Sequence, residues 1–217
     1  MTETALIWDL DGTLLDSYGI IVPSLQETLA EFQIDTEAET LLRRVTETSV
    51  SAVIREAAEK TGRSFAEIKD RYSAVSGGRV LEIPPIPRAR ETLEALAAMG
   101  ALQFVYTHRG STTAPVLEHL GFQRFFKEVV TSLRGFPRKP GPDALLYLME
   151  RYGLDKSRTF YIGDRTLDMD CARNAGIPGV LYAPSGAGTA DWVVRDLLEV
   201  RDIAAEAAER SGYHGAP

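Results

Sequence analysis

The chain has 217 residues, a formal net charge of −7, 44% hydrophobic residues and 25% charged residues. This composition is typical of a globular protein with one large domain, or a core domain and a smaller one. The acidic balance argues against nucleic acid or a membrane surface as the main partner. The single cysteine, Cys171, excludes an intrachain disulfide, and the first residues lack a signal-peptide pattern, so we expect a cytoplasmic protein.

A short apolar run at residues 5–8 predicts a buried strand of a parallel sheet. Asp9 and Asp11 follow where this strand should end, and Gly12 then permits a backbone turn. Side chains at positions i and i+2 of an extended segment point to the same side, so the two carboxylates can share one site. Such close like charges repel, and a bound cation is the usual remedy; the alternative is a strand end with two solvated acids.

A long stretch with helical spacing of apolar residues comes next, and it contains no convincing strand. The pattern predicts helices near residues 21–32, 38–45, 50–61 and 64–77. A proline-rich segment at 84–87 ends this stretch. We therefore expect an inserted helical domain at 17–83, a core domain built from 1–16 and 84–210, and a flexible tail at 211–217.

From residue 84 onward, helical and strand patterns alternate. Strands are predicted at 102–106, 128–130, 159–162, 180–182 and 192–194, and helices at 90–99, 112–120, 142–152, 167–175 and 197–209. Such alternation implies βαβ units. The expected fold class is therefore α/β, a Rossmann-like parallel sheet with helices on both faces, plus the inserted helical domain.

Polar side chains follow several predicted strands, where open parallel sheets form their sites. They are Thr107, His108 and Arg109 after the second strand, Lys139 in the loop after the third, and Asp164 and Asp168 after the fourth. Oxygen ligands without a clustered histidine or cysteine suit a hard cation such as Mg²⁺. A lysine and a hydroxyl beside a metal suit a phosphoryl group.

Taken together, these pieces resemble the haloacid dehalogenase superfamily, and specifically the phosphatase branch of its subfamily I. That family carries the motifs DxDGT, Ser or Thr, Lys and GDxxxD in this order, and the resemblance spans nearly the whole chain. Here the motifs stand at residues 9–13, at Thr107, at Lys139 and at residues 163–168. The segment 135–140 resembles the phosphoglycolate-phosphatase-like members, and the helical insertion resembles a C1-type cap.

The resemblance implies a role for each carboxylate. Asp9 would attack phosphorus and form an aspartyl-phosphate. Asp11 would protonate the leaving alcohol and then take a proton from water; dehalogenase relatives lack this second aspartate. The cofactor would be Mg²⁺, held by Asp9, the backbone carbonyl of Asp11 and Asp164. Asp168 would help to bind the metal, directly or through water, or would only cap a helix.

The resemblance also implies the groups that bind phosphate. Thr107 and backbone amides after it would hold phosphate oxygens, and Lys139 would balance the negative charge. Gly12 and Thr13 would shape the loop or touch phosphate. His108 occupies a place where many relatives carry Asn, and it either donates to phosphate or only fills the loop.

Two arginines, Arg109 and Arg165, flank these motifs and are expected to be surface charges. In the helical domain, Thr46, Thr48 and Ser49 of the predicted loop 45–50 are expected to face the substrate. Arg43 or Arg44 would pair with a substrate carboxylate, or form an exposed basic helix end.

The implied function is Mg²⁺-dependent hydrolysis of a small phosphorylated metabolite, phosphoglycolate-like or a sugar phosphate. Two alternatives remain at this point. One is a phosphosugar mutase of the same superfamily, and the other is a protein that keeps the fold and binds phosphate without turnover. We expect a monomer or homodimer with no nucleic-acid or membrane partner.

Overall fold

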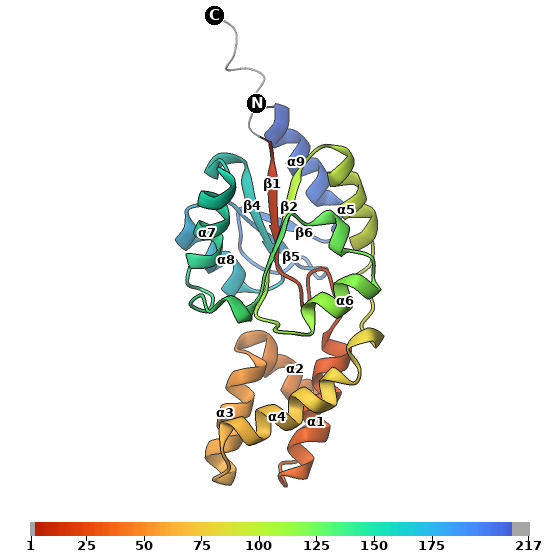
Figure 1. Cartoon of the computed structure of the whole chain (residues 1–217), viewed down its shortest axis with the longest axis vertical. Helices are drawn as coiled ribbons and strands as arrows, with labels where there is room; N and C mark the ends of the chain where they lie inside the picture. Colours follow the sequence, from red (N-terminus) through yellow and green to blue (C-terminus); the bar gives the residue numbers. More distant parts are fainter. Residues whose placement is uncertain (1–2, 210–217) are drawn as a thin grey trace, which may run out of the picture. The chain divides into compact units, whose positions relative to one another are not determined.

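The structure is a computed structural model that describes residues 3–209. These residues divide into two compact units (Figure 1). The sheet unit comprises residues 3–15 and 85–209, and the helical unit comprises residues 16–84. The flexible tail expected at residues 211–217 lies outside the described residues.

The sheet unit contains six parallel strands in the order β3-β2-β1-β4-β5-β6, which confirms the predicted α/β fold class. They are β1 (Ala5–Trp8), β2 (Leu102–Tyr106), β3 (Glu128–Val130), β4 (Thr159–Gly163), β5 (Gly179–Tyr182) and β6 (Trp192–Val194). β1 lies between β2 and β4, with Ile7 in register with Phe104 and Tyr161. The strand order reverses direction at β1, and ligands of such sheets bind where the order reverses.

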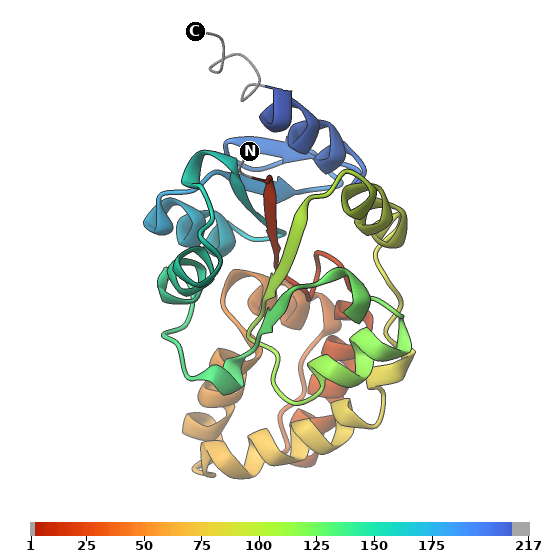
Figure 2. The same cartoon turned by 45° about the horizontal axis from the view of Figure 1, so that its top comes forward.

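Helices cover both faces of this sheet, with α7 and α8 on one face and α5 and α9 on the other (Figures 1 and 2). The helices are α5 (Ala89–Ala98), α6 (Thr113–His119), α7 (Asp143–Tyr152), α8 (Thr166–Ala175) and α9 (Glu199–Glu209). Short 3₁₀ turns lie at η2 (Gln123–Phe125), η3 (Ser132–Arg134) and η4 (Lys156–Arg158). Because all strands are parallel, the connection after each of β1 to β5 returns to the same end of the sheet.

The alternation of side chains along β1 decides where its last residues point. Ala5 and Ile7 pack in one core cluster with residues of α7 and α8. Trp8 belongs to the other face, where its indole Nε1 donates to Oε1 of Gln103 at 3.3 Å and Gln103 Nε2 donates to the Leu93 carbonyl of α5. Asp9 follows in the same alternation, so its side chain points to the same side as Ala5 and Ile7, which is the side of α7 and α8.

The helical unit contains the four helices expected between residues 17 and 83. They are α1 (Tyr18–Glu31), α2 (Ala38–Glu47), α3 (Val50–Thr61) and α4 (Phe65–Gly77), followed by the 3₁₀ turn η1 (Val80–Glu82). Leu25, Leu41, Ile54 and Ile68 are fully buried and belong to one apolar cluster, so this unit has its own core. Ser64 caps α4 by accepting a hydrogen bond from the Glu67 backbone N–H at 3.1 Å.

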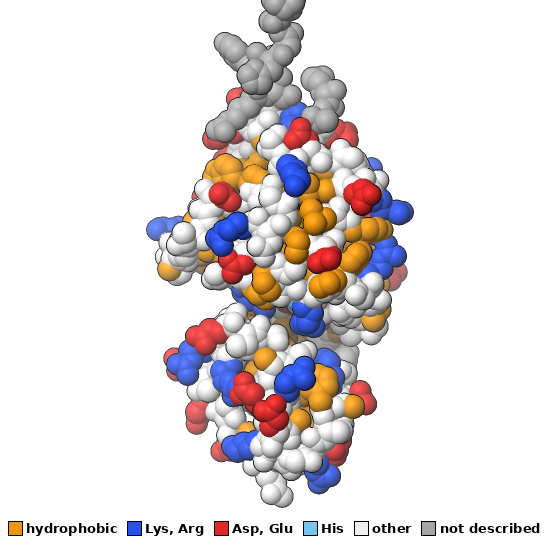
Figure 3. Space-filling model, turned by 90° about the vertical axis from the view of Figure 1, so that its left-hand side faces the viewer, with side chains coloured by type: hydrophobic (Ala, Val, Ile, Leu, Met, Phe, Trp, Pro, Cys, Tyr) orange, Lys and Arg blue, Asp and Glu red, His pale blue; other side chains and the backbone are white. Residues whose placement is uncertain are grey.

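Within residues 3–209, none of the helices combines the length and apolar character needed to cross a membrane. On the face drawn in Figure 3, acidic and basic side chains are interspersed over each unit. Both units thus present mixed charge on this face.

Candidate active site

The predicted site residues of the sheet unit gather at the carboxyl ends of β1, β2 and β4. Asp9 follows β1, Thr107 follows β2, Asp164 follows β4, Asp168 lies in the first turn of α8, and Lys139 lies in the loop between η3 and α7. These three strands are neighbours in the sheet, so residues far apart in sequence become adjacent.

Lys139 lies at the centre of this group. Its Nζ donates to Asp9 Oδ1 at 2.6 Å and to Asp168 Oδ1 at 2.7 Å, and the lysine side chain is fully buried. Burial alone lowers the pKa of Lys139, but Asp168 and Asp9 outweigh it and raise that pKa above its ordinary value. The rings of Tyr106 and Tyr161 lie 5.0 and 5.2 Å from Nζ, within cation–π range. Lys139 is therefore held as an ammonium ion.

The carboxylate of Asp9 is buried, and only one of its two oxygens is hydrogen-bonded by the described residues. It is 2% exposed, and among the described residues its Oδ2 has no hydrogen-bond partner. Burial raises the pKa of Asp9 to about 6, although Lys139 acts in the opposite direction. Leaving a carboxylate oxygen buried and unpaired is costly, so this atom is suited to a cation or a reacting group.

Three carboxylates at this point fit a divalent cation. Asp9, Asp164 and Asp168 each offer an oxygen, and these oxygens lie within 4.8 Å of one another. Thr13 orients one of them by donating from Oγ1 to Asp164 Oδ1 at 3.2 Å. A donor set made of carboxylate oxygens suits Mg²⁺.

Asp168 caps a helix, which is one of the two alternatives left open for it, and its binding of a metal stays a prediction. Besides Lys139, its Oδ1 accepts from the Tyr161 hydroxyl at 3.3 Å, and its Oδ2 accepts from the Arg165 backbone N–H at 3.2 Å, which caps α8. Gly163 lies against it: a Cβ at residue 163 would stand 2.4 Å from Asp168 Cβ. Only glycine permits this approach, so the close packing of β4 on α8 sets the position of Asp168.

Arg109 forms an ion pair with Asp11. Its Nη2 lies 2.5 Å from Asp11 Oδ1, and the side chains are 11% and 25% exposed, respectively. The expectation that Arg109 and Arg165 are surface charges is wrong. The Arg165 side chain is 15% exposed, with its Nε 3.8 Å from Asp168 Oδ2. Each arginine lies close to an aspartate of the site, Arg109 to Asp11 and Arg165 to Asp168. The available sequence signal was an arginine two residues after Thr107 and another next to Asp164.

His108 joins the loop after β2 to the loop of Lys139. Its Nε2 accepts from the Lys139 backbone N–H at 3.0 Å, and its Nδ1 lies 3.0 Å from Arg138 Nη2. Burial, with Lys139 and Arg138, lowers the pKa of His108 to about 2, so the ring is neutral. Thr107 beside it is 1% exposed and accepts from the Arg109 backbone N–H at 3.1 Å. His108 thus holds Lys139 in place.

Gly12 and Thr13 form the turn after Asp11. Gly12 has a φ of +85°, which favours glycine, and its N–H donates to the Leu15 carbonyl at 2.8 Å. The Thr13 hydroxyl donates to Asp164, as described above, and the backbone N–H of Thr13 donates to the Leu10 carbonyl at 3.3 Å. The donor groups of Gly12 and Thr13 therefore form hydrogen bonds that stabilise this loop. Contact of these two residues with phosphate stays a prediction.

The comparison with protein families decides which family this arrangement belongs to. The model described as haloacid dehalogenase-like hydrolase matches residues 6–181. The chain belongs to this family.

Curated relatives of this hydrolase match it over most of its length. A phosphoglycolate phosphatase from Vibrio parahaemolyticus is 30% identical over 226 residues, covering 94% of this chain and 96% of the relative. Another from Agrobacterium fabrum is 31% identical over 181 residues, covering 80% and 78%.

Solved structures agree with the fold of this hydrolase. A predicted phosphoglycolate phosphatase from Haemophilus somnus superposes with a TM-score of 0.80 at 24% identity, covering 94% of this chain and 98% of that one. A subfamily IA hydrolase from Geobacter sulfurreducens gives 0.75 at 23% identity, covering 93% and 96%. The haloacid dehalogenase fold is therefore shared over nearly the whole chain.

In the helical unit of this hydrolase, the hydroxyls expected to face the substrate form local bonds. Thr46 Oγ1 donates to the Leu42 carbonyl at 3.0 Å, and Thr48 Oγ1 donates to the Arg44 carbonyl at 2.6 Å. Ser49 accepts from the Ala52 N–H and caps α3. Most of segment 45–50 belongs to α2 and α3, and its contact with a substrate stays a prediction.

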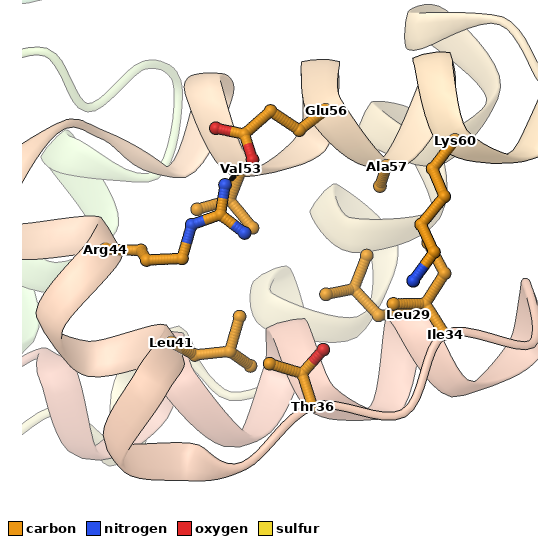
Figure 4. A pocket seen from close by; sticks show the side chains of 9 residues that line it. All are labelled: Leu29, Ile34, Thr36, Leu41, Arg44, Val53, Glu56, Ala57 and Lys60. Carbon is orange, nitrogen blue, oxygen red and sulfur yellow. Dashed lines mark ion pairs between the residues drawn. The ribbon is translucent and has the colours of Figure 1, made fainter.

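The helical unit also contains a cavity of about 310 Å³ between α1, α2 and α3 (Figure 4). Leu29, Leu41 and Val53 line its apolar part. Arg44 and Glu56 point toward each other beside it and form an ion pair. Arg44, considered above for a substrate carboxylate, is thus engaged within its own unit.

Proposed function

We propose that this hydrolase is a Mg²⁺-dependent phosphomonoester phosphatase that works through an aspartyl-phosphate on Asp9. The observation that carries this proposal is the buried, unpaired Oδ2 of Asp9 beside the ammonium of Lys139 and the carboxylates of Asp164 and Asp168. The similarity to relatives named phosphoglycolate phosphatase supports the same chemistry.

In the first step, Asp9 Oδ2 attacks phosphorus, and the bond between phosphorus and the leaving oxygen breaks. The leaving oxygen takes a proton from Asp11 and departs as an alcohol. Lys139 stays bound to Asp9 Oδ1 and offsets the charge that gathers on the phosphoryl oxygens, and the Thr107 hydroxyl binds one of these oxygens.

In the second step, water attacks the phosphorus of the aspartyl-phosphate. Asp11, now a carboxylate, takes a proton from that water, and the bond from phosphorus to Asp9 breaks to release inorganic phosphate. Asp9, Asp164 and the Asp11 backbone carbonyl would hold Mg²⁺, with Asp168 in support. When bound, Mg²⁺ neutralises the carboxylates and polarises the phosphoryl group, so that one anion can approach another.

The substrate class proposed is a small phosphorylated metabolite, either phosphoglycolate-like or a sugar phosphate. The names of the curated relatives favour phosphoglycolate. A screen of phosphorylated metabolites with Mg²⁺, ranked by kcat/KM, tests this assignment, and phosphoglycolate is expected near the top of the ranking.

The reaction itself is tested with p-nitrophenyl phosphate and with radiolabelled phosphoglycolate. Wild-type protein should release phosphate only with Mg²⁺ present, and rapid acid quenching should trap label on Asp9. Asp9→Asn should abolish both turnover and labelling. Asp170→Asn is the matched control, because Asp170 lies on α8 but pairs with Arg173 at the surface. Turnover that survives Asp9→Asn, or label on another residue, would refute the proposal.

A further inference from the structure

The guanidinium group of Arg109 contacts both oxygens of the Asp11 carboxylate. Its Nε lies 3.1 Å from Asp11 Oδ1 and 3.3 Å from Oδ2, and its Nη2 lies 2.5 Å from Oδ1. A planar guanidinium that reaches both oxygens fixes the rotation of a carboxylate as well as its distance, which a single point charge cannot do.

The surroundings of Arg109 hold it at several other points. Its Nη1 donates to Thr112 Oγ1 at 3.3 Å. Its backbone N–H donates to Thr107 Oγ1 at 3.1 Å, and its carbonyl accepts from the Ser132 N–H at 3.2 Å. Arg109 is therefore fixed to the ends of β2 and β3 before it reaches Asp11. Little conformational entropy remains to be lost when it orders the carboxylate.

The pair leaves part of Asp11 accessible. The Asp11 side chain is 25% exposed and that of Arg109 is 11% exposed, so part of Asp11 stays accessible while the two are paired. Asp11 itself follows β1 within a short turn, in which its backbone forms a β-bridge to Leu15. The Arg109 side chain therefore joins this turn to the loop after β2.

We propose that Arg109 is a positioning residue, which aims the Asp11 carboxylate at the leaving oxygen and then at the attacking water. This inference rests on the function proposed above, in which Asp11 is the general acid and base. It assigns to Arg109 a role in the rate of proton transfer and not in the binding of substrate.

The role has a consequence that depends on the leaving group. An alkyl oxygen is a poor leaving group without a proton, whereas p-nitrophenolate departs readily unprotonated. Misaiming Asp11 should therefore slow the first step strongly for an alkyl phosphate and weakly for p-nitrophenyl phosphate. A residue that binds the phosphoryl group itself would instead affect both substrates alike and would raise KM.

The experiment compares wild-type protein with Arg109→Gln, Arg109→Lys, Asp11→Asn and the double variant Asp11→Asn/Arg109→Gln. First-turnover rates are measured with phosphoglycolate and with p-nitrophenyl phosphate. Arg109→Gln should slow the phosphoglycolate step by on the order of 100-fold, and the nitrophenyl burst by less than about threefold. Arg109→Lys should lose less of the phosphoglycolate rate than Arg109→Gln, because an ammonium still contacts the carboxylate although it does not form the paired contacts of a guanidinium.

The double variant separates the two readings. If Arg109 acts through Asp11, adding Arg109→Gln to Asp11→Asn should cause almost no further loss. Additive losses, or an equal rise in KM for both substrates, would overturn the inference in favour of direct substrate binding. Arg124→Gln is the matched control, because Arg124 forms an exposed ion pair with Glu94 at 3.1 Å.

A measurement without turnover keeps this inference separate from the proposed function. In nuclear magnetic resonance spectra of the substrate-free protein, the Arg109 Nε–H signal should be protected from exchange and should lose that protection in Asp11→Asn. Loss of activity in Asp9→Asn together with an unprotected Arg109 would overturn the inference alone. A protected Arg109 in a protein that cannot be labelled on Asp9 would overturn the proposed function, and with it the catalytic role of Arg109.

Discussion

The ammonium of Lys139 lies 2.6 Å from Asp9 Oδ1, and both side chains are almost completely excluded from water. The same nitrogen donates to Asp168 at 2.7 Å, so one cation offsets the charge of two buried carboxylates. The stability of the sheet unit and the proposed chemistry therefore involve the same three side chains.

Replacing Lys139 with Met should destabilise the sheet unit by about 3–5 kcal/mol, because Asp9 and Asp168 are left buried without their cation. Both tryptophans, Trp8 and Trp192, belong to this unit, so urea unfolding followed by tryptophan fluorescence reports on it. Lys60→Met in the exposed part of α3 is the control and should change little. A loss below about 1 kcal/mol would contradict the buried pairing.

The pKa of Asp9 predicts a pH dependence for the metal-free protein. Its pKa rises from 3.8 to about 6 on folding, so between these values the folded state binds more protons than the unfolded state. The contribution of Asp9 to the free energy of unfolding therefore falls as pH rises through this window. Asp9→Asn removes the titrating group, and its stability relative to wild type should increase by roughly 2–3 kcal/mol from pH 4 to pH 7.

The measurement for that prediction is urea unfolding in a chelator at several pH values for both proteins. A stability difference that stays constant over the window would show that the environment of Asp9 does not disfavour its charge. The exposed Asp170→Asn variant should run parallel to wild type throughout.

Mg²⁺ should raise the thermal midpoint of the sheet unit. At a concentration 100-fold above Kd, binding stabilises the folded state by about 2.7 kcal/mol, which corresponds to roughly 5–10 °C for a chain of this size. Asp164→Asn should remove most of the shift, since it takes one carboxylate from the cluster. Scanning fluorimetry in Mg²⁺ and in chelator measures this change in thermal midpoint. If Asp164→Asn shows the same change as wild type, the ion binds elsewhere.

Gly163→Ala should cost about 1–3 kcal/mol and reduce Mg²⁺ affinity, because the new Cβ would stand 2.4 Å from the Cβ of Asp168. Circular dichroism during urea unfolding and a Mg²⁺ titration test the two effects. Gly19→Ala is the matched control: nothing lies within 4 Å of a Cβ at that position of α1, so it should be neutral or stabilising. Equal behaviour of the two variants would contradict the close approach.

Much of the fold could be predicted from local patterns. Short apolar runs located β1, β2, β3 and β6 at their observed bounds, and the 3.6-residue spacing of apolar residues located the helices to within a few residues. The carboxyl ends of parallel strands meet at one edge, so the neighbourhood of Asp9, Lys139 and Asp164 also followed from the order of the motifs.

The pairings inside that neighbourhood could not be predicted. Arg109 was expected at the surface, yet it reaches Asp11 across 98 positions of sequence, and His108 accepts from the Lys139 N–H across 31. Which cation meets which carboxylate depends on how loops pack above the strand ends, and hydrophobic periodicity carries no information about loop paths.

The sequence by itself determined the parallel sheet, the inserted helices and the residues gathered at the strand ends. The reason is that the local spacing of apolar residues reflects which side chains become buried. Only the tertiary structure decided that Lys139 holds Asp9 and Asp168 together, and that Arg109 pairs with Asp11. Those contacts form between loops brought together by folding, and there the strong attraction of buried opposite charges selects the partners.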